Sequence, residues 1–266
     1  MIQHVKIHYL DTNRPLARDL MQEVENWLDK GELARRDRLL RPSDRISFVL
    51  SHAFTRKSLG DILGLHPKNI HLTQDDRGKP KLASIHGCTS LCFNLSHTQG
   101  LAAIAISEDE VGLDVENKET RGSDIDIAKH FFSAHEYQEI SKHSSEYQSE
   151  YLLLYWTLKE AFLKAEGWGI LEALDSFEFH IVDQKNTDPS IEININPTLR
   201  PEQISLRILD ERIKPTRPWI FWHTRLANPH LMSLAVAPRS DCHSLCVDPR
   251  AWMHEDWLNP GSTLLP

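Results

Sequence analysis

The stretch YLLLYWTLKEAFLKAEGWGI, from Tyr151 to Ile170, predicts a long amphipathic helix. Apolar residues recur in it at helical spacing and form a stripe that is expected to face a core: Tyr155, Leu158, Phe162 and Ala165. Gly167 and Gly169 follow the stripe and indicate where the helix ends.

Three other residues of this helix, Trp156, Glu160 and Lys164, are spaced four apart and therefore share a second face. We expect this face to lie away from the core and to present an acid and a base one turn apart. The simpler interpretation is an exposed Glu–Lys pair that only stabilises the helix. A second segment upstream favours a chemical role.

That segment is VGLDVE, from Val111 to Glu116. Strand alternation places Gly112, Asp114 and Glu116 on one face and the three apolar residues on the other. Two carboxylates so close together repel each other unless a cation lies between them, and magnesium prefers carboxylate and phosphate oxygens. The segment therefore suggests a metal site, with a solvated strand end as the alternative.

Five short segments of the chain occur in a characteristic order: RGKPKL (77–82), FNLSHT (93–98), VGLDVE (111–116), FFSAHEY (131–137) and WTLKEAFLKAEGWGI (156–170). Together they resemble the 4′-phosphopantetheinyl transferases, in the long, two-lobed type that includes the surfactin-synthetase activator. This resemblance implies an α+β fold of two similar α/β lobes, related by a pseudo-twofold axis, with the active site between them. We expect the lobes at residues 1–108 and 109–240, and a loosely ordered tail at 241–266.

The resemblance also implies an activity. Such an enzyme transfers the 4′-phosphopantetheine group of coenzyme A, its co-substrate, to a serine of an acyl or peptidyl carrier protein, depends on Mg2+, and releases 3′,5′-ADP. A non-catalytic module on the same fold that binds a carrier protein or coenzyme A is the alternative. A magnesium-dependent phosphohydrolase acting on a nucleotide is a third possibility.

The same resemblance assigns residues to the chemistry. It implies a metal triad of Asp114, Glu116 and Glu160, in which Glu160 is also the general base. It implies a coenzyme A site that includes Arg56, Lys79, Ser96, His97, Lys159 and Lys164. His97 is expected at the pyrophosphate as a candidate proton donor, and Trp156 in the pocket wall. Glu136 is a secondary candidate, because the pattern from Ser133 to Glu136 also fits a helix capping box.

Composition narrows the possible partners. The chain has 266 residues, 40% hydrophobic, and a net charge of −8, which argues against a sequence-independent nucleic-acid binder. Its first residues lack the basic and apolar regions of a secretory signal, and it contains no apolar run of 18 residues. We therefore expect a cytoplasmic protein without a membrane segment, and the resemblance to the two-lobed type implies a monomer. The four cysteines form two C-x3-C pairs, a spacing that fits zinc poorly.

Other elements follow from periodicity. We expect a first strand at 5–10, helical segments at 18–40, 43–59 and 124–130, and short strands at 178–181 and 191–195. Arg45, His52 and Arg56 share one face of the helix that Ser43 is expected to cap. Five arginines between residues 35 and 45 form either a solvated surface or a site for phosphate or an acidic partner. A weak internal repeat relates two predicted hairpins, 91–107 and 218–238.

Overall fold

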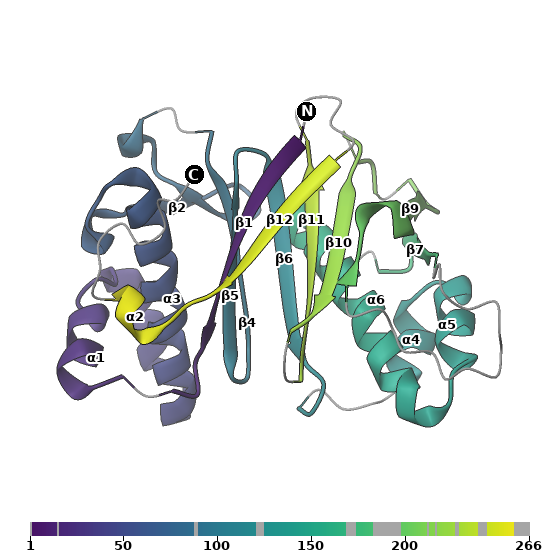
Figure 1. Cartoon of the computed structure of the whole chain (residues 1–266), viewed down its shortest axis with the longest axis horizontal. Coiled ribbons are helices and arrows are strands. Elements are labelled where there is room, and N and C mark those ends of the chain that lie inside the picture. The colour runs from purple at the N-terminus through teal and green to yellow at the C-terminus, as the bar shows by residue number, and fades with distance from the viewer. Residues whose placement is uncertain are drawn as a thin grey trace.

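The structure is a computed structural model that describes residues 2–14, 16–87, 90–120, 125–168, 174–182, 198–211, 213–215, 217–226, 229–238 and 244–257 (Figure 1). Its helices are α1 (Arg18–Glu25), α2 (Lys30–Asp37), α3 (Pro42–Leu63), α4 (Asp126–Phe131), α5 (Ala134–Ser141) and α6 (Ser145–Glu166). Its strands are β1 (Ile2–Asp11), β2 (Leu72–Gln74), β3 (Pro80–Leu82), β4 (Cys92–Thr98), β5 (Leu101–Ser107), β6 (Glu110–Asn117), β7 (Phe177–Ile181), β8 (Thr198–Leu199), β9 (Ile204–Ile208), β10 (Ile220–Arg225), β11 (His230–Ala237) and β12 (Ser244–Ala251).

Two four-stranded sheets form the centre of the molecule, one in each lobe. Their strand orders are β12-β1-β5-β4 and β6-β11-β10-β8. Each lobe has one 22-residue helix, α3 or α6, which ends at a left-handed glycine, Gly64 or Gly167. Figure 1 shows the two lobes side by side with their helices on the outer flanks. The predicted α+β fold of two similar lobes is confirmed, as are the antiparallel hairpins β4–β5 and β10–β11.

The lobes share an apolar core between the inner faces of the two sheets. β6 contributes Val111, Leu113 and Val115 to it, all at most 1% exposed, and β11 contributes Met232 and Leu234. The alternation predicted for VGLDVE is therefore confirmed. The opposite face of β6, with Gly112, Asp114 and Glu116, is directed toward α6.

Side chains join the two sheets where β4 meets β6. Asn94 Oδ1 accepts a hydrogen bond from the main-chain N–H of Leu113 at 2.9 Å, and Ser96 Oγ accepts one from that of Val115 at 3.2 Å. Edge strands carry main-chain groups without sheet partners, and buried ones need other acceptors. The polar residues of FNLSHT thus provide hydrogen-bond acceptors for main-chain N–H groups at the edge of β6. These hydrogen bonds fix the position of one lobe against the other.

The N-terminal helical region differs from its prediction. The pattern at 18–40 forms two helices, because Asp29 accepts a hydrogen bond from Glu32 N and begins α2 with a capping box. The next helix begins one residue before the predicted Ser43 cap, since Pro42 occupies its first turn and Arg41 is the N-cap residue.

The expectation of a loosely ordered tail is wrong for residues 244–257. β12 pairs in parallel with β1 over eight residues, from Ile2 opposite Ser244 to Tyr9 opposite Ala251. Trp252 and Trp257 are about 95% buried in the core of the first lobe. The C-terminal segment therefore completes the N-terminal lobe.

The remaining predicted elements fall as follows. The first strand lies within β1, the segment at 178–181 within β7, and α4 covers most of 124–130. The strand predicted at 191–195 lies outside the described residues. No described helix has the length and apolar character needed to cross a membrane.

Candidate active site

Gly112 lets β6 and α6 approach each other closely. A Cβ at this position would lie 2.0 Å from the carbonyl oxygen of Ala161 and 2.5 Å from the main-chain nitrogen of Ala165. Only glycine therefore fits. The contact brings the polar face of the strand against the helix, so that Lys164 reaches Asp114.

Three polar side chains meet at the joint between the lobes. Lys164 Nζ lies 2.6 Å from Asp114 Oδ1 and donates to Ser96 Oγ at 2.9 Å, and Ser96 Oγ donates to the same Asp114 oxygen at 3.0 Å. Asp114 and Ser96 are each 4% exposed, whereas Lys164 is partly exposed. The structure thus joins residues from three of the predicted motifs into one cluster.

His97 follows Ser96 on β4 but lies on the opposite face of the strand. His97 is exposed to solvent at one side. Protein atoms packed around the ring partly desolvate it and so lower its pKa, and the positive charge of Lys164 lowers the pKa further. A lowered pKa favours the neutral imidazole. Its role as a proton donor at the pyrophosphate stays a prediction.

Glu116 and Glu160 are buried carboxylates, 9% and 3% exposed. Within the described part of the chain, no three acidic, histidine or cysteine side chains lie close enough together to hold a metal ion. The predicted triad with Asp114 is therefore not a preformed metal site, and Lys164 supplies the positive charge beside Asp114 instead.

The donor set nevertheless suits a hard cation. Asp114 Oδ2 is buried and makes no hydrogen bond within the described residues. The triad would offer carboxylate oxygens, the ligands that magnesium prefers. The residues fit magnesium in their chemistry, provided that their side chains move into coordination distance.

The expectation of an outward polar face on α6 is wrong. β6 and β11 cover that side of the helix, so Glu160 is buried. Trp156 packs against Phe132 in the core of the second lobe, with ring centroids 6.3 Å apart. Residues on both sides of the apolar stripe are buried because α6 lies between the sheet and the outer elements of its lobe.

Lys159 does not face the cofactor site. It is 0% exposed, its Nζ donates to the carbonyl oxygens of Leu174 and Phe177 at 2.6 and 2.7 Å, and it forms an ion pair with Glu136 at 2.8 Å. Glu136 is equally buried and closes the capping box with Ser133. Both residues serve the core of the second lobe, and their expected contact with the pocket is not supported.

Lys79 links the lobes. Its Nζ donates to the carbonyl oxygens of Ala165 and Val111 at 2.7 and 3.2 Å and pairs with Glu110 at 3.1 Å. Arg77, in the same turn, donates to the carbonyl oxygen of Glu166 at 2.8 Å. Two cations of the first lobe thus cap the C-terminal end of α6, where carbonyl groups lack helical partners. The three hydrogen bonds of Lys79 use all of its donors, so the predicted contact with coenzyme A would require one of them to break.

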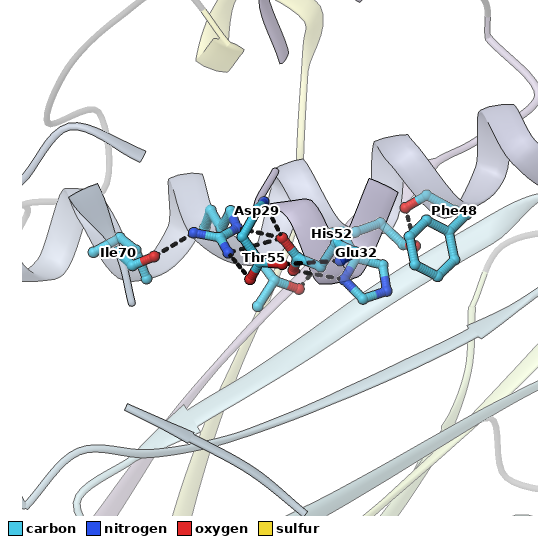
Figure 2. Close-up of polar contacts among 8 residues, drawn as sticks. Asp29, Glu32, Phe48, His52, Thr55 and Ile70 are labelled. Carbon is cyan, nitrogen blue, oxygen red and sulfur yellow. Dashed lines mark hydrogen bonds and ion pairs between the residues drawn. The ribbon is translucent and has the colours of Figure 1, made fainter. Parts of the chain in front are cut away.

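Arg56 is also held by protein partners, of which Asp29, Glu32 and Ile70 are labelled in Figure 2. Its guanidinium donates to Glu32 Oε2 at 3.0 and 2.7 Å, to Asp29 Oδ2 at 2.9 Å, and to the carbonyl oxygen of Ile70. It is 2% exposed. Arg56 thus holds the carboxylates of Asp29 and Glu32 at the start of α2, and its role in holding coenzyme A stays a prediction.

A cavity of about 400 Å³ lies beside these carboxylates in the first lobe. Its lining includes Glu32, Arg35, His52, Phe93 and Leu95. Phe93 and Leu95 precede His97 at alternate positions of β4, so the cavity lies on the strand face that carries His97.

Sequence reasoning missed two contributors to the site. Gly112 could have been found from its position between apolar strand residues, where glycine often marks close backbone approach. The capping-box pattern from Asp29 to Glu32 is visible in the sequence as well. The contacts of Glu32 with His52 and Arg56, however, join residues that are 20 and 24 positions apart, and no local pattern predicts them.

Comparisons with known proteins agree with this architecture. The 4′-phosphopantetheinyl transferase superfamily model matches residues 110–219, and the 4′-phosphopantetheinyl transferase N-terminal model matches residues 13–109. The chain is similar to the 4′-phosphopantetheinyl transferase HetI of Nostoc sp. (strain PCC 7120), at 35% identity over 56% of this chain and 64% of HetI.

It is also similar to the 4′-phosphopantetheinyl transferase psf-1 of Bacillus pumilus, at 31% identity over 60% of this chain and 67% of the relative. The similarity to Sfp of Bacillus subtilis (strain 168) is 25% identity over 66% of this chain and 77% of Sfp. The alignment spans slightly less than two thirds of HetI itself. With both lobes matched and the polar cluster at their joint, the chain belongs to the 4′-phosphopantetheinyl transferase superfamily.

Proposed function

We propose that this protein transfers the 4′-phosphopantetheine group of coenzyme A to a serine hydroxyl of an acyl or peptidyl carrier protein and releases 3′,5′-ADP. The observation that carries the proposal is the cluster at the lobe joint, in which Ser96, Asp114 and Lys164 contact one another. Phosphoryl-type transfer needs positioned positive charge and a base near the entering hydroxyl. The partly exposed Lys164 and the buried acids Asp114 and Glu160 would supply both.

Each residue has a distinct part in this proposal. Lys164 is the partly exposed ammonium that would leave its ion pair with Asp114 to neutralise an incoming phosphate. Glu160 would take the proton of the carrier serine, directly or through a water molecule. Ser96 lines the joint, and His97 would contact the pyrophosphate.

Asp114, Glu116 and Glu160 are the residues that would hold Mg2+. When bound, the ion would neutralise charge on the pyrophosphate. The chain's own contribution is to hold these acids on β6 and α6 at the contact formed by Gly112.

We further infer a cytoplasmic monomer with coenzyme A and a carrier protein as its partners, and without a nucleic-acid or membrane partner. The relatives are named as transferases, and both of their lobes are matched here. The non-catalytic binding module is the competing function, but a module of that kind has no need for a buried Asp114 beside Lys164 or for a buried Glu160 one turn before it on α6.

Intact-mass analysis of an apo carrier protein incubated with this protein, coenzyme A and magnesium tests the proposal. We expect a gain of one phosphopantetheine group that chelation abolishes. Glu160→Gln and Asp114→Ala should remain folded and lose at least about 10²-fold in rate, as when a charged catalytic contact is removed. Glu23→Gln, at an exposed position on α1, is the matched control.

Three outcomes would contradict all or part of the proposal. A folded Glu160→Gln protein with near-normal turnover would remove this residue from the mechanism. Coenzyme A binding without modification of any of several unrelated carriers would favour the binding module. Release of free phosphopantetheine would indicate a phosphohydrolase.

A further inference from the structure

Three polar side chains are buried between α6 and the sheet of the second lobe. Thr157 Oγ1 lies 2.7 Å from Ser233 Oγ, and Ser233 Oγ lies 2.8 Å from His223 Nδ1. All three residues are at most 1% exposed. Ser233 and His223 lie outside the five sequence motifs, and the proposed function gives none of the three a part.

The hydrogen bonds of these side chains run in one direction. Thr157 Oγ1 donates to the carbonyl oxygen of Leu154 at 3.1 Å, so its single proton is used and it accepts from the hydroxyl of Ser233. Ser233 Oγ in turn accepts from the Nδ1–H of His223. Burial lowers the pKa of His223 to about 3, so the ring is neutral and still carries the one proton that this arrangement needs.

The buried side chains continue a row that begins at Asp114. The strands β6, β11 and β10 are neighbours in the sheet of the second lobe (Figure 1). Asp114 on β6 is opposite Ser233 on β11, and Ser233 is opposite His223 on β10. Residues directly opposite each other in a sheet share a face, so all three are directed toward α6. The row therefore extends from the lobe joint into the interior of the second lobe.

Glu160 lies between two contacts of α6 with this sheet. Thr157, one turn before it, is hydrogen bonded to Ser233, and Ala161, directly after it, lies against Gly112. The contact at Gly112 is steric, so it sets the distance between helix and strand but not the position of the helix along the sheet. A slip of one residue would move the helix by about 1.5 Å along its axis. The directional hydrogen bond at Thr157 opposes such a slip.

The ion pair between Lys164 and Asp114 is a second directional contact between α6 and the sheet. The proposed function requires this pair to open when Lys164 meets a phosphate. The hydrogen bond between Thr157 and Ser233 involves neither of these charges, so it continues to hold α6 at that moment. A buried polar network with its hydrogen bonds made specifies one arrangement of a core, which apolar residues of the same shape do not.

We infer that Thr157, Ser233 and His223 are positioning residues, which fix the register of α6, and with it the place of Glu160, against β6. The inference rests on the proposed function, because it concerns the same site. His223 acts through Ser233, and Ser233 acts through Thr157.

Steady-state transfer to an apo carrier protein by the full chain, with coenzyme A and magnesium, tests this role. Thr157→Val keeps the branched shape and removes the hydroxyl, whereas Thr157→Ser keeps the hydroxyl. We expect Thr157→Val to lower kcat at least about tenfold, with a smaller effect on KM, because a small misplacement of a reacting group slows the chemical step. Thr157→Ser should retain most of the kcat.

A double-mutant cycle identifies the hydrogen bond itself. Ser233→Ala should lower kcat as Thr157→Val does, and the double variant should be no slower than the slower single one, because both changes break the same contact. Thr224→Val is the matched control. Thr224 makes a hydroxyl–hydroxyl hydrogen bond of 2.8 Å with Thr198 in the same sheet, but it follows His223 on β10 and so points away from α6. Its kcat should equal that of the unaltered chain.

All rates are compared at a temperature at which circular dichroism shows every variant to be folded, so that lost stability alone cannot lower them. A folded Thr157→Val protein with unaltered kcat overturns the inference and leaves the proposed function intact. Equal losses in Thr157→Ser and Thr157→Val would also overturn it, since the hydroxyl would then not account for the loss. No transfer by the unaltered chain would overturn the proposed function, and the inference with it.

Discussion

Glu32 is a buried carboxylate whose ionised form is stabilised by three neighbours, His52, Arg56 and the main chain of Asp29. These contacts outweigh burial and lower its pKa from 4.5 to about 2. Because the pKa is lower in the folded state, the ionised group stabilises the fold above about pH 4.5. This contribution, about 3 kcal/mol, is lost as the pH falls toward 2.

Urea unfolding of the chain at several pH values measures this effect. We expect the free energy of unfolding to fall between pH 4.5 and pH 2, and Glu32→Gln to be less stable at pH 7 with a smaller fall on acidification. Glu23→Gln, on the exposed surface of α1, should retain the full fall. Equal pH dependence in Glu32→Gln and the unaltered chain would show that Glu32 does not contribute in this way.

At the scale of the secondary-structure element, the contact between β6 and α6 leaves no room for a side chain at Gly112. A methyl group at Gly112 would lie 2.0 Å from the carbonyl oxygen of Ala161, and main-chain atoms cannot rotate away as a side chain can. We expect Gly112→Ala to lower the free energy of unfolding by about 3 kcal/mol. It should also reduce transfer, because α6 must move away from Asp114. Thermal unfolding and the carrier mass assay measure the two effects.

Gly31→Ala is the matched control, because an added Cβ there meets only a side-chain oxygen of Asp29, at 3.2 Å. Its stability should change by less than about 1 kcal/mol. A Gly112→Ala protein as stable as the unaltered chain would mean that helix and strand are less closely packed in solution.

Periodicity predicted the elements on which the site rests but not which of their faces are covered. The end of α6 at Gly167 and the alternation of β6 follow from local sequence. Lys159 and Lys164 cannot be separated in this way, because both lie beside the apolar stripe. Only the position of the sheet decides that Lys159 enters the core and Lys164 meets Asp114. Likewise, no local pattern shows that Lys79 caps the other lobe's helix.

At the scale of the whole molecule, the two ends of the chain form one structural unit. β12 pairs in parallel with β1, and Trp252 packs against Phe54 with ring centroids 5.1 Å apart. A parallel partner more than 230 residues away leaves no pattern in the local sequence, and the mixture of prolines and aromatics in this segment obscures the strand. The tail could therefore not be placed from the sequence.

Trp252→Ala tests whether the C-terminal segment holds the first lobe together. The indole is 5% exposed and also contacts His8 and Trp257, with ring centroids 5.5 and 6.3 Å away. Removing it should lower the free energy of unfolding by about 3–5 kcal/mol, a large part of the stability of an ordinary domain. Cys246→Ser, at an exposed position of β12, should change the free energy of unfolding by less than about 0.5 kcal/mol.

An unaltered unfolding midpoint for Trp252→Ala in urea would show that the C-terminal segment does not dock in solution. A lowered midpoint would show that the first lobe, and with it the wall that carries His52, depends on the last strand of the chain.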